Sequence, residues 1–233
     1  NNHAGDQGDS GLLDTFEAAQ DHDITVVGAG KDLKRAMTGA VERTDAGVKV
    51  AFLGFTDVLP VGYPATNASP GVAPGRADQA AVEKAIAKAA GRADFVVVGW
   101  HWNFEYKTAP SALETQEGRA AIDAGADVVF AHHPHVLNGV ERYRDGLIFY
   151  SLGNLLFSGW SGETAETMIV SASVTPKRIY ARLIPVLLSP AGLPTVAKGD
   201  DAERILGRVR RLSADLGTTV AIEDGYGWVR VRR

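Results

Sequence analysis

The histidines of this chain concentrate in one short segment, His132-His133-Pro134-His135, which directly follows an apolar run. A residue before proline is restricted to extended backbone, and in extended chain residues two positions apart point to the same side. The spacing therefore predicts that His133 and His135 project together, while His132 faces away. Two imidazoles on one side favour a transition-metal site, and a solvent-exposed polar turn is the alternative.

A further histidine, His101, follows the apolar run Phe95–Trp100. A lone histidine beside aromatic residues is often a packed core residue. However, His101 and the histidine cluster both lie at the end of a predicted strand, and this shared position favours a metal-ligand role for His101. Glu105 lies four residues further on. It could hydrogen-bond an imidazole, accept a proton or bind substrate, and a solvated surface glutamate is the alternative.

The chain opens with Asn1-Asn2-His3-Ala4-Gly5-Asp6. An asparagine side-chain carbonyl is a hard oxygen ligand, and a histidine beside it can stand on the open side of a metal, where a leaving group needs a proton. Asn-His is a weak signal alone. Together with His101 and the pair His133/His135, it completes the order Asn-His, lone His and His-x-His.

Composition limits the chemistry that these residues can do. The chain has 233 residues and no cysteine, so a transition metal would have to bind to nitrogen and oxygen ligands. The net charge is −4 and no basic stripe is present, which argues against nucleic acid as a partner. No apolar run reaches the roughly 20 residues of a membrane span. The chain begins without Met, which suggests that a leader has been removed.

The elements that must position these residues alternate between helix and strand up to about residue 130. Apolar runs that end in glycine or polar residues predict buried strands, and segments with helical apolar spacing predict helices. In open α/β sheets ligands bind at the carboxyl ends of strands, and two successive strands end on histidine here. The predicted strands are 24–27, 48–55, 95–98 and 128–130, and the predicted helices are 12–20, capped by Asp9 or Ser10, 76–90 and 113–124.

The second part of the sequence predicts mainly antiparallel strands. Asp145-Gly146 lies between two apolar runs and predicts a hairpin of 136–143 with 147–152. Residues 168–174 and 179–188 predict another antiparallel pair. Residues 201–216 predict an amphipathic helix with a solvated face. That face contains Arg204, Arg208 and Arg211, and the proline-rich segment 59–75 is predicted to be a long surface loop of the kind that can act as a lid.

The order of the motifs resembles the calcineurin-like metallophosphoesterases, in which Asn-His, a lone His and His-x-His bind two metals. A closer resemblance is to the CapA or PgsA family of poly-γ-glutamate capsule synthesis. The strings that carry it are NNHAGDQGDSGLLDTF, VKVAFLGFTD, HWNFEY and GADVVFAHHPHVLNGVERYRDGLIFYSLGNLLF. The resemblance implies one domain over 1–233 with a metallophosphatase-type α/β sandwich, in which helices flank mixed sheets.

The resemblance also implies roles for individual residues and a cofactor. Two divalent metals, chosen among Mn, Fe and Zn, would lower the pKa of a bridging water. The implied ligands are Asn2, His101, His133 and His135, the catalytic candidates are His3 as general acid and Glu105, and the substrate-binding candidates are His132 and Asn154.

Three departures from the family pattern concern this site. The family usually has glycine where this chain has Asn103, which a left-handed backbone would tolerate, and where it has Ala131. The relatives also have two earlier segments, with a GD and an NLE motif, that supply carboxylates to the metals. Their absence here implies either a fragment that lacks the N-terminal strands or a site without its carboxylate half.

Two functions of different classes follow from the resemblance. One is a metal-dependent hydrolase of a phosphoester within capsule synthesis. The other is a non-catalytic accessory protein that binds or guides an anionic polymer, together with capsule-synthesis membrane proteins. Both readings imply an extracytoplasmic, cell-envelope location with a membrane anchor in the full-length protein.

Overall fold

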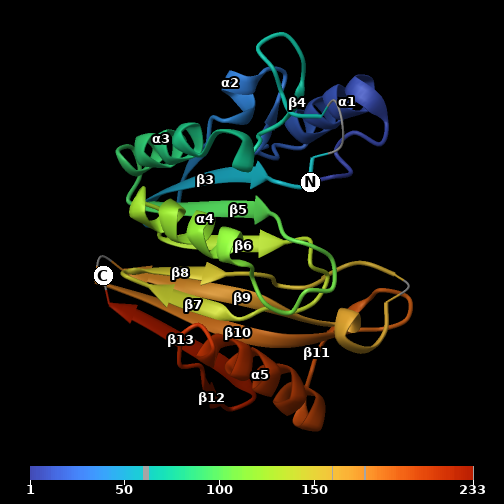
Figure 1. The fold of residues 1–233 in the computed structure, drawn as a ribbon, viewed down its shortest axis with the longest axis vertical. Helices are drawn as coiled ribbons and strands as arrows, with labels where there is room; N and C mark the ends of the chain where they lie inside the picture. Colours follow the sequence, from blue (N-terminus) through green and yellow to red (C-terminus); the bar gives the residue numbers. More distant parts are fainter. Residues whose placement is uncertain (60–62, 159, 176, 233) are drawn as a thin grey trace. The chain divides into compact units, whose positions relative to one another are not determined.

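The computed structural model describes residues 1–59, 63–158, 160–175 and 177–232. Its contacts divide the chain into two compact units (Figure 1). The first unit contains 1–102 and 123–129, and the second contains 103–122 and 130–233. The single domain over 1–233 stays a prediction. Part of the predicted lid, residues 60–62, lies outside the described residues.

The first unit contains a mixed sheet in the strand order β2-β3-β5. β2 (Ala40–Arg43) runs antiparallel to β3 (Lys49–Thr56), and β3 runs parallel to β5 (Phe95–His101). The buried side chains Leu53, Val98 and Ile86 join this sheet to helix α3 in one core. The remaining elements are α1 (Gly8–Asp21), β1 (Ala29–Gly30), α2 (Leu33–Ala36), β4 (Gly71–Val72), the 3-10 turn η1 (Arg76–Asp78) and α3 (Gln79–Ala90).

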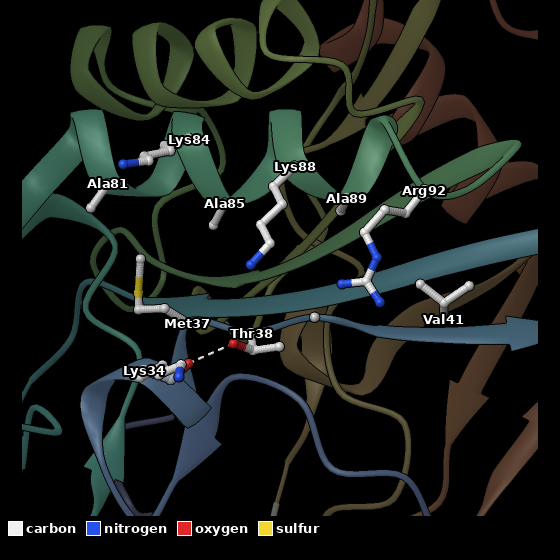
Figure 2. A pocket seen from close by; sticks show the side chains of 11 residues that line it. Lys34, Met37, Thr38, Val41, Ala81, Lys84, Ala85, Lys88, Ala89 and Arg92 are labelled. Carbon is white, nitrogen blue, oxygen red and sulfur yellow. Dashed lines mark hydrogen bonds between the residues drawn. The ribbon is translucent and has the colours of Figure 1, made fainter.

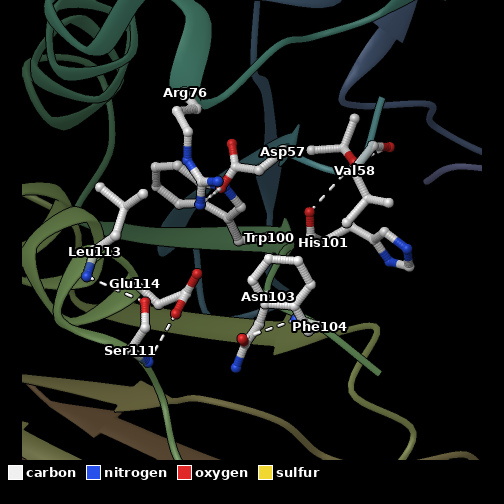
Figure 3. Close-up of polar contacts among 11 residues, drawn as sticks. Asp57, Val58, Arg76, Trp100, His101, Asn103, Phe104, Ser111, Leu113 and Glu114 are labelled. Atoms are coloured by element: carbon white, nitrogen blue, oxygen red, sulfur yellow. Dashed lines mark hydrogen bonds and ion pairs between the residues drawn. The ribbon is translucent and has the colours of Figure 1, made fainter. Parts of the chain in front are cut away.

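The second unit contains helix α4 (Ala112–Asp123), the end of β6 (Val128–His132), and the hairpin of β7 (Val140–Tyr143) with β8 (Gly146–Phe149). Helix α4 begins with a capping box, because the Ser111 backbone N–H donates to Glu114 Oε2 at 2.7 Å (Figure 3).

A five-stranded antiparallel sheet completes the second unit. β10 pairs with β9 along one edge, and with β13 and β11 along the other. Helix α5 packs on this sheet through Ile205, Leu206 and Val209, which are fully buried. The elements are the turn η2 (Gly162–Ala165), β9 (Glu166–Thr175), β10 (Arg178–Leu188), β11 (Pro194–Val196), α5 (Gly199–Ala214), β12 (Ala221–Glu223) and β13 (Tyr226–Arg232).

Most of the predicted elements are confirmed, as is the α/β class with a mixed sheet flanked by helices. Four details were wrong. Residues 71–75 of the predicted surface loop are buried and include β4. Residues 24–27 form no strand, because Ile24 is 62% exposed and Val26 39% exposed, so this apolar run is not in a core. Helix α1 begins at Gly8, and the preceding Gln7 makes no side-chain cap. Arg204 and Arg208 form ion pairs with the buried Glu166 and are not simply solvated.

Within the described ranges, none of the helices combines the length and the apolar character that a membrane crossing requires.

Candidate metal centre

The His-Pro-His segment brings two imidazoles together, although not in the way that the sequence predicts. The ring centroids of His133 and His135 lie 5.8 Å apart. The backbone is not extended, because φ is 99° at His133 and 58° at His135. Both residues are therefore in the left-handed region, which non-glycine residues rarely adopt. Such backbone is found at functional sites, where surrounding contacts hold it in place.

Glu105 joins the two histidines in a potential metal-binding group. Each residue of this triad of Glu105, His133 and His135 offers a ligand atom, and these three atoms lie within 4.8 Å of one another. A backbone hydrogen bond places the glutamate, since the Tyr106 N–H donates to the Pro134 carbonyl at 2.8 Å. The triad ranges from buried His133 to exposed Glu105, so the carboxylate stands on the side open to solvent.

Asn154 orients one of the two imidazoles. Its Oδ1 lies 2.7 Å from His135 Nδ1, and its Nδ2 donates to the carbonyls of His135 and Thr164. An amide oxygen can only accept, so Nδ1 of His135 carries the proton and Nε2 retains a lone pair. A partner that fixes the tautomer in this way is typical of metal-binding histidines. The substrate-binding role of Asn154 stays a prediction.

Two aromatic side chains contact the imidazole of His135. The ring of Trp160 is stacked on the imidazole with centroids 5.1 Å apart, and Phe157 contacts it edge-on at 5.7 Å. Tyr106 lies 6.2 Å from Trp160. The two rings in contact with His135 restrict the rotation of its imidazole.

His132 is the last residue of β6 and is not part of the triad. Protein atoms around the ring displace part of its hydration, and this desolvation lowers the pKa of the His132 imidazole. A neutral imidazole can donate one hydrogen bond and accept another. The proposed contact of His132 with substrate stays a prediction.

The first unit brings Asn2 and His101 together, 99 positions apart in the sequence. Asn2 Oδ1 lies 2.9 Å from His101 Nε2. The His101 carbonyl accepts from the Asp57 N–H at 2.9 Å, which fixes the end of β5 against the end of β3. Figure 3 shows Asp57 beside Trp100 and Arg76, at 2.9 Å from Trp100 Nε1 and 3.6 Å from Arg76 Nη2.

His3 is held by Asp6, a residue to which the sequence assigned no role. His3 Nδ1 lies 2.9 Å from Asp6 Oδ2, and both side chains are largely exposed. The carboxylate fixes the ring and leaves Nε2 available for proton transfer. The signal in the sequence was the spacing of His3 and Asp6, because two residues three positions apart can meet within one turn. The predicted ligands and acid therefore occur in two groups, one in each unit, and their union in one centre stays a prediction.

A separate cavity of about 240 Å³ in the first unit is not suited to a metal (Figure 2). Its lining contains Lys34, Lys84, Lys88 and Arg92 over Met37 and small apolar residues, with no carboxylate or imidazole. Cations of the protein repel a metal ion. The triad is consequently the better candidate for metal chemistry.

The triad fits a divalent transition metal. Two imidazoles and a carboxylate form a nitrogen and oxygen donor set of the kind that binds Mn, Fe or Zn. Neighbouring ligands at about 2.1 Å from a metal are about 3 to 3.5 Å apart, so small side-chain movements within the 4.8 Å group would suffice. Asn2 Oδ1 and His101 Nε2 lie 2.9 Å apart as hydrogen-bond partners, and because the amide oxygen accepts, Nε2 would have to lose its proton before it could bind a metal.

Comparisons with known proteins agree with the motifs. The family described as "Bacterial capsule synthesis protein PGA_cap" matches residues 1–159, which include all eight predicted site residues. The PGA biosynthesis protein CapA of Bacillus subtilis is 36% identical over 227 residues, which are 97% of this chain and 58% of that protein. The capsule biosynthesis protein CapA of Bacillus anthracis is 42% identical over 175 residues, 73% of this chain and 42% of that protein.

A probable polyglutamine synthesis accessory protein of Mycobacterium tuberculosis is 28% identical over 245 residues, which cover 94% of this chain and 62% of that protein. The chain thus spans about half the length of the two Bacillus relatives. The matched range covers more than half of this chain and contains the Asn-His, lone His and His-x-His motifs. The chain therefore belongs to the bacterial capsule synthesis protein PGA_cap family.

Proposed function

We propose that this protein acts in capsule synthesis at the cell envelope, on poly-γ-glutamate, with a metal-dependent phosphoester hydrolase site at the triad. The names of the two Bacillus relatives, which refer to PGA and capsule biosynthesis, support this role. The observation that carries the chemistry is the triad itself, with three ligand atoms within 4.8 Å and the His135 tautomer set by Asn154. In this proposal the full-length protein is anchored to the membrane and works with membrane proteins of capsule synthesis.

In this proposal the site residues have separate roles in metal binding, ligand orientation and proton transfer. Glu105, His133 and His135 would hold the metal, which supplies a Lewis acid and a water of lowered pKa. Asn154 keeps the Nδ1 proton of His135 in place, which leaves Nε2 as the nitrogen that would bind the metal. His3, held at Nδ1 by Asp6, suits the general acid that gives a proton to the leaving oxygen.

Metal content tests the proposal directly. We expect about one equivalent of Mn, Fe or Zn per purified chain, as measured by plasma mass spectrometry, and its loss in the double variant His133→Ala, His135→Ala. The control His22→Ala removes an exposed histidine at the end of α1, outside the triad. It should leave the metal content unchanged. Absence of metal from the wild type after incubation with all three ions would refute the site.

Turnover tests the hydrolase. The metal-loaded protein should hydrolyse an aryl phosphate, and His3→Ala should lower kcat by about 10²- to 10⁴-fold without releasing metal, as expected for loss of a general acid. Equal activity of His3→Ala and the wild type would assign proton transfer to another group.

A non-catalytic accessory function is the second candidate. The Mycobacterium tuberculosis relative is named as a probable accessory protein, which favours this candidate. In that case the triad would bind metal without turnover, and the protein would bind polymer stoichiometrically. Turnover of aryl phosphate that depends on the triad would exclude this candidate.

A further inference from the structure

Five arginines gather around one hollow in the second unit. The hollow has a volume of about 570 Å³. It lies where β10 begins, where β13 ends, and at the turn between β7 and β8, and Figure 1 shows these three places at the same end of the unit. Its polar lining consists of Arg142, Arg144, Arg178, Arg230, Arg232 and Tyr180.

The strand register places like charges directly opposite each other. Arg178 of β10 pairs with Arg232 of β13, and Tyr180 pairs with Arg230. The neighbouring pair, Ile179 and Val231, is buried. The alternation of side chains therefore leaves the arginines on the outer face, where they are exposed. Like charges that face each other across an antiparallel pair destabilise the sheet, so this arrangement has a cost in folding free energy.

The protein supplies little to neutralise four of these arginines. In the part of the chain that the structure describes, no carboxylate forms an ion pair with Arg142, Arg178, Arg230 or Arg232. Arg178 Nη1 donates to the Tyr180 hydroxyl at 2.7 Å, which orients the guanidinium without neutralising it. This concentration of positive charge occurs on a chain whose net charge is −4. An external anion would remove the repulsion.

We propose that this arginine hollow binds an extended polycarboxylate chain. The proposal rests on the proposed capsule function, which identifies this polycarboxylate as γ-linked polyglutamate. Guanidinium groups bind carboxylates through two parallel hydrogen bonds. The hollow is then a polymer-binding site of its own, because none of its residues belongs to the triad.

The spacing of the arginines suits such a polymer. Each γ-linked repeat adds five backbone bonds, against three in an ordinary peptide, and so extends by about 6 Å. Alternate residues on a strand lie about 6.7 Å apart, and residues opposite each other across two strands about 5 Å apart. Carboxylates of successive repeats can therefore meet successive guanidinium groups, and several weak contacts add up along one chain.

Fluorescence anisotropy with labelled γ-linked polyglutamate tests this site. The variant Arg178→Glu, Arg230→Glu should lose more than tenfold in affinity, and wild-type binding should weaken as salt is added. The matched control Lys198→Glu, Arg210→Glu makes the same change in net charge at exposed positions of α5 and its cap. It should lose no more than about twofold. Equal losses in the two variants would overturn the proposal.

Unfolding cannot explain the expected loss. Arg178→Glu places a carboxylate opposite Arg232 and should raise the melting temperature, because a repulsive pair becomes attractive. A lower melting temperature together with lost binding would count against the proposal. So would tighter binding of a single-stranded oligonucleotide of the same charge, or equal competition by monomeric glutamate at the same carboxylate concentration.

The metal measurement separates this proposal from the proposed function. The arginine variants should keep the metal content of the wild type. If the wild-type protein holds metal but does not bind the polymer, only the proposal for the arginine hollow is overturned. If the protein binds the polymer through the arginines but holds no metal, only the proposal of a hydrolase site is overturned.

Discussion

At the scale of single residues, the site depends on how two imidazoles are held. His133 and His135 both have positive φ, and the imidazole of His135 is hydrogen-bonded to Asn154 and stacked on Trp160. Three constraints on one side chain reduce the entropy that it would lose on binding a metal. The ring is therefore preorganised before any metal arrives.

Substitution of Asn154 tests this preorganisation. Asn154→Ala removes the acceptor of the His135 Nδ1 proton and should lower metal affinity by about 10- to 100-fold, measured by competition with a chelator of known affinity. Asn154→Asp retains an oxygen at the same place and should keep most of the affinity. If both variants lost affinity equally, the amide donors to His135 and Thr164 would be the decisive contacts.

At the scale of elements, helix α5 is joined to the five-stranded sheet by a buried carboxylate. Glu166 at the start of β9 is 4% exposed. Its Oε1 lies 2.8 Å from Arg204 Nε, and its Oε2 lies 2.8 Å from Arg208 Nη1, a close ion pair that is not aligned as a hydrogen bond. A buried carboxylate with two guanidinium partners fixes the position of the helix, because moving α5 would leave the charge unpaired.

Neutralising this carboxylate should destabilise the protein. Glu166→Gln leaves Arg204 and Arg208 without a buried counter-charge and should lower the free energy of unfolding by ~2 to 3 kcal/mol, at the lower end for a broken buried pair because Arg204 is half-exposed. Urea unfolding measures the change.

Glu163→Gln is the matched control for this prediction. Glu163 is 54% exposed and makes one contact of 3.0 Å with Arg208. Its neutralisation should cost less than about 1 kcal/mol, as is usual for exposed pairs. A larger loss in Glu163→Gln than in Glu166→Gln would show that burial of Glu166 does not decide the stability of this contact.

At the scale of the whole molecule, the chain passes repeatedly between its two units. It changes unit after Trp102, after Ile122 and within β6 after Val129. Neither unit is therefore one continuous segment, and β6 contributes residues to both. A strand that belongs to both units links their stabilities, because neither unit can lose its structure without affecting this shared strand.

We expect one cooperative unfolding transition as a result. The first unit contains Trp100 and Trp102, and the second contains Trp160 and Trp228, so tryptophan fluorescence reports on both. Fluorescence and far-UV circular dichroism should give the same midpoint, and the calorimetric and van't Hoff enthalpies should agree. Two resolved transitions would show that the units unfold independently.

The sequence by itself determined the types of candidate ligand and most of the elements that carry them. Hydrophobic periodicity is local, so β3, β5, α3 and the β9–β10 pair follow from apolar spacing alone. Asn103 has φ of 73°, the left-handed backbone that would tolerate asparagine where the family usually has glycine. The candidate site residues came from the resemblance to the family, because the order of the motifs can be recognised in the sequence without knowing how they are arranged in space.

Only the tertiary structure decided how those residues meet. Proline after His133 predicted extended backbone, yet contacts from distant segments hold that residue at positive φ, as when Tyr106 bonds to the Pro134 carbonyl. The arginine hollow is assembled from three segments that are far apart in the sequence. Local preferences are worth less than about 1 kcal/mol per residue, so non-local hydrogen bonds and packing can override them where the chain leaves its strands.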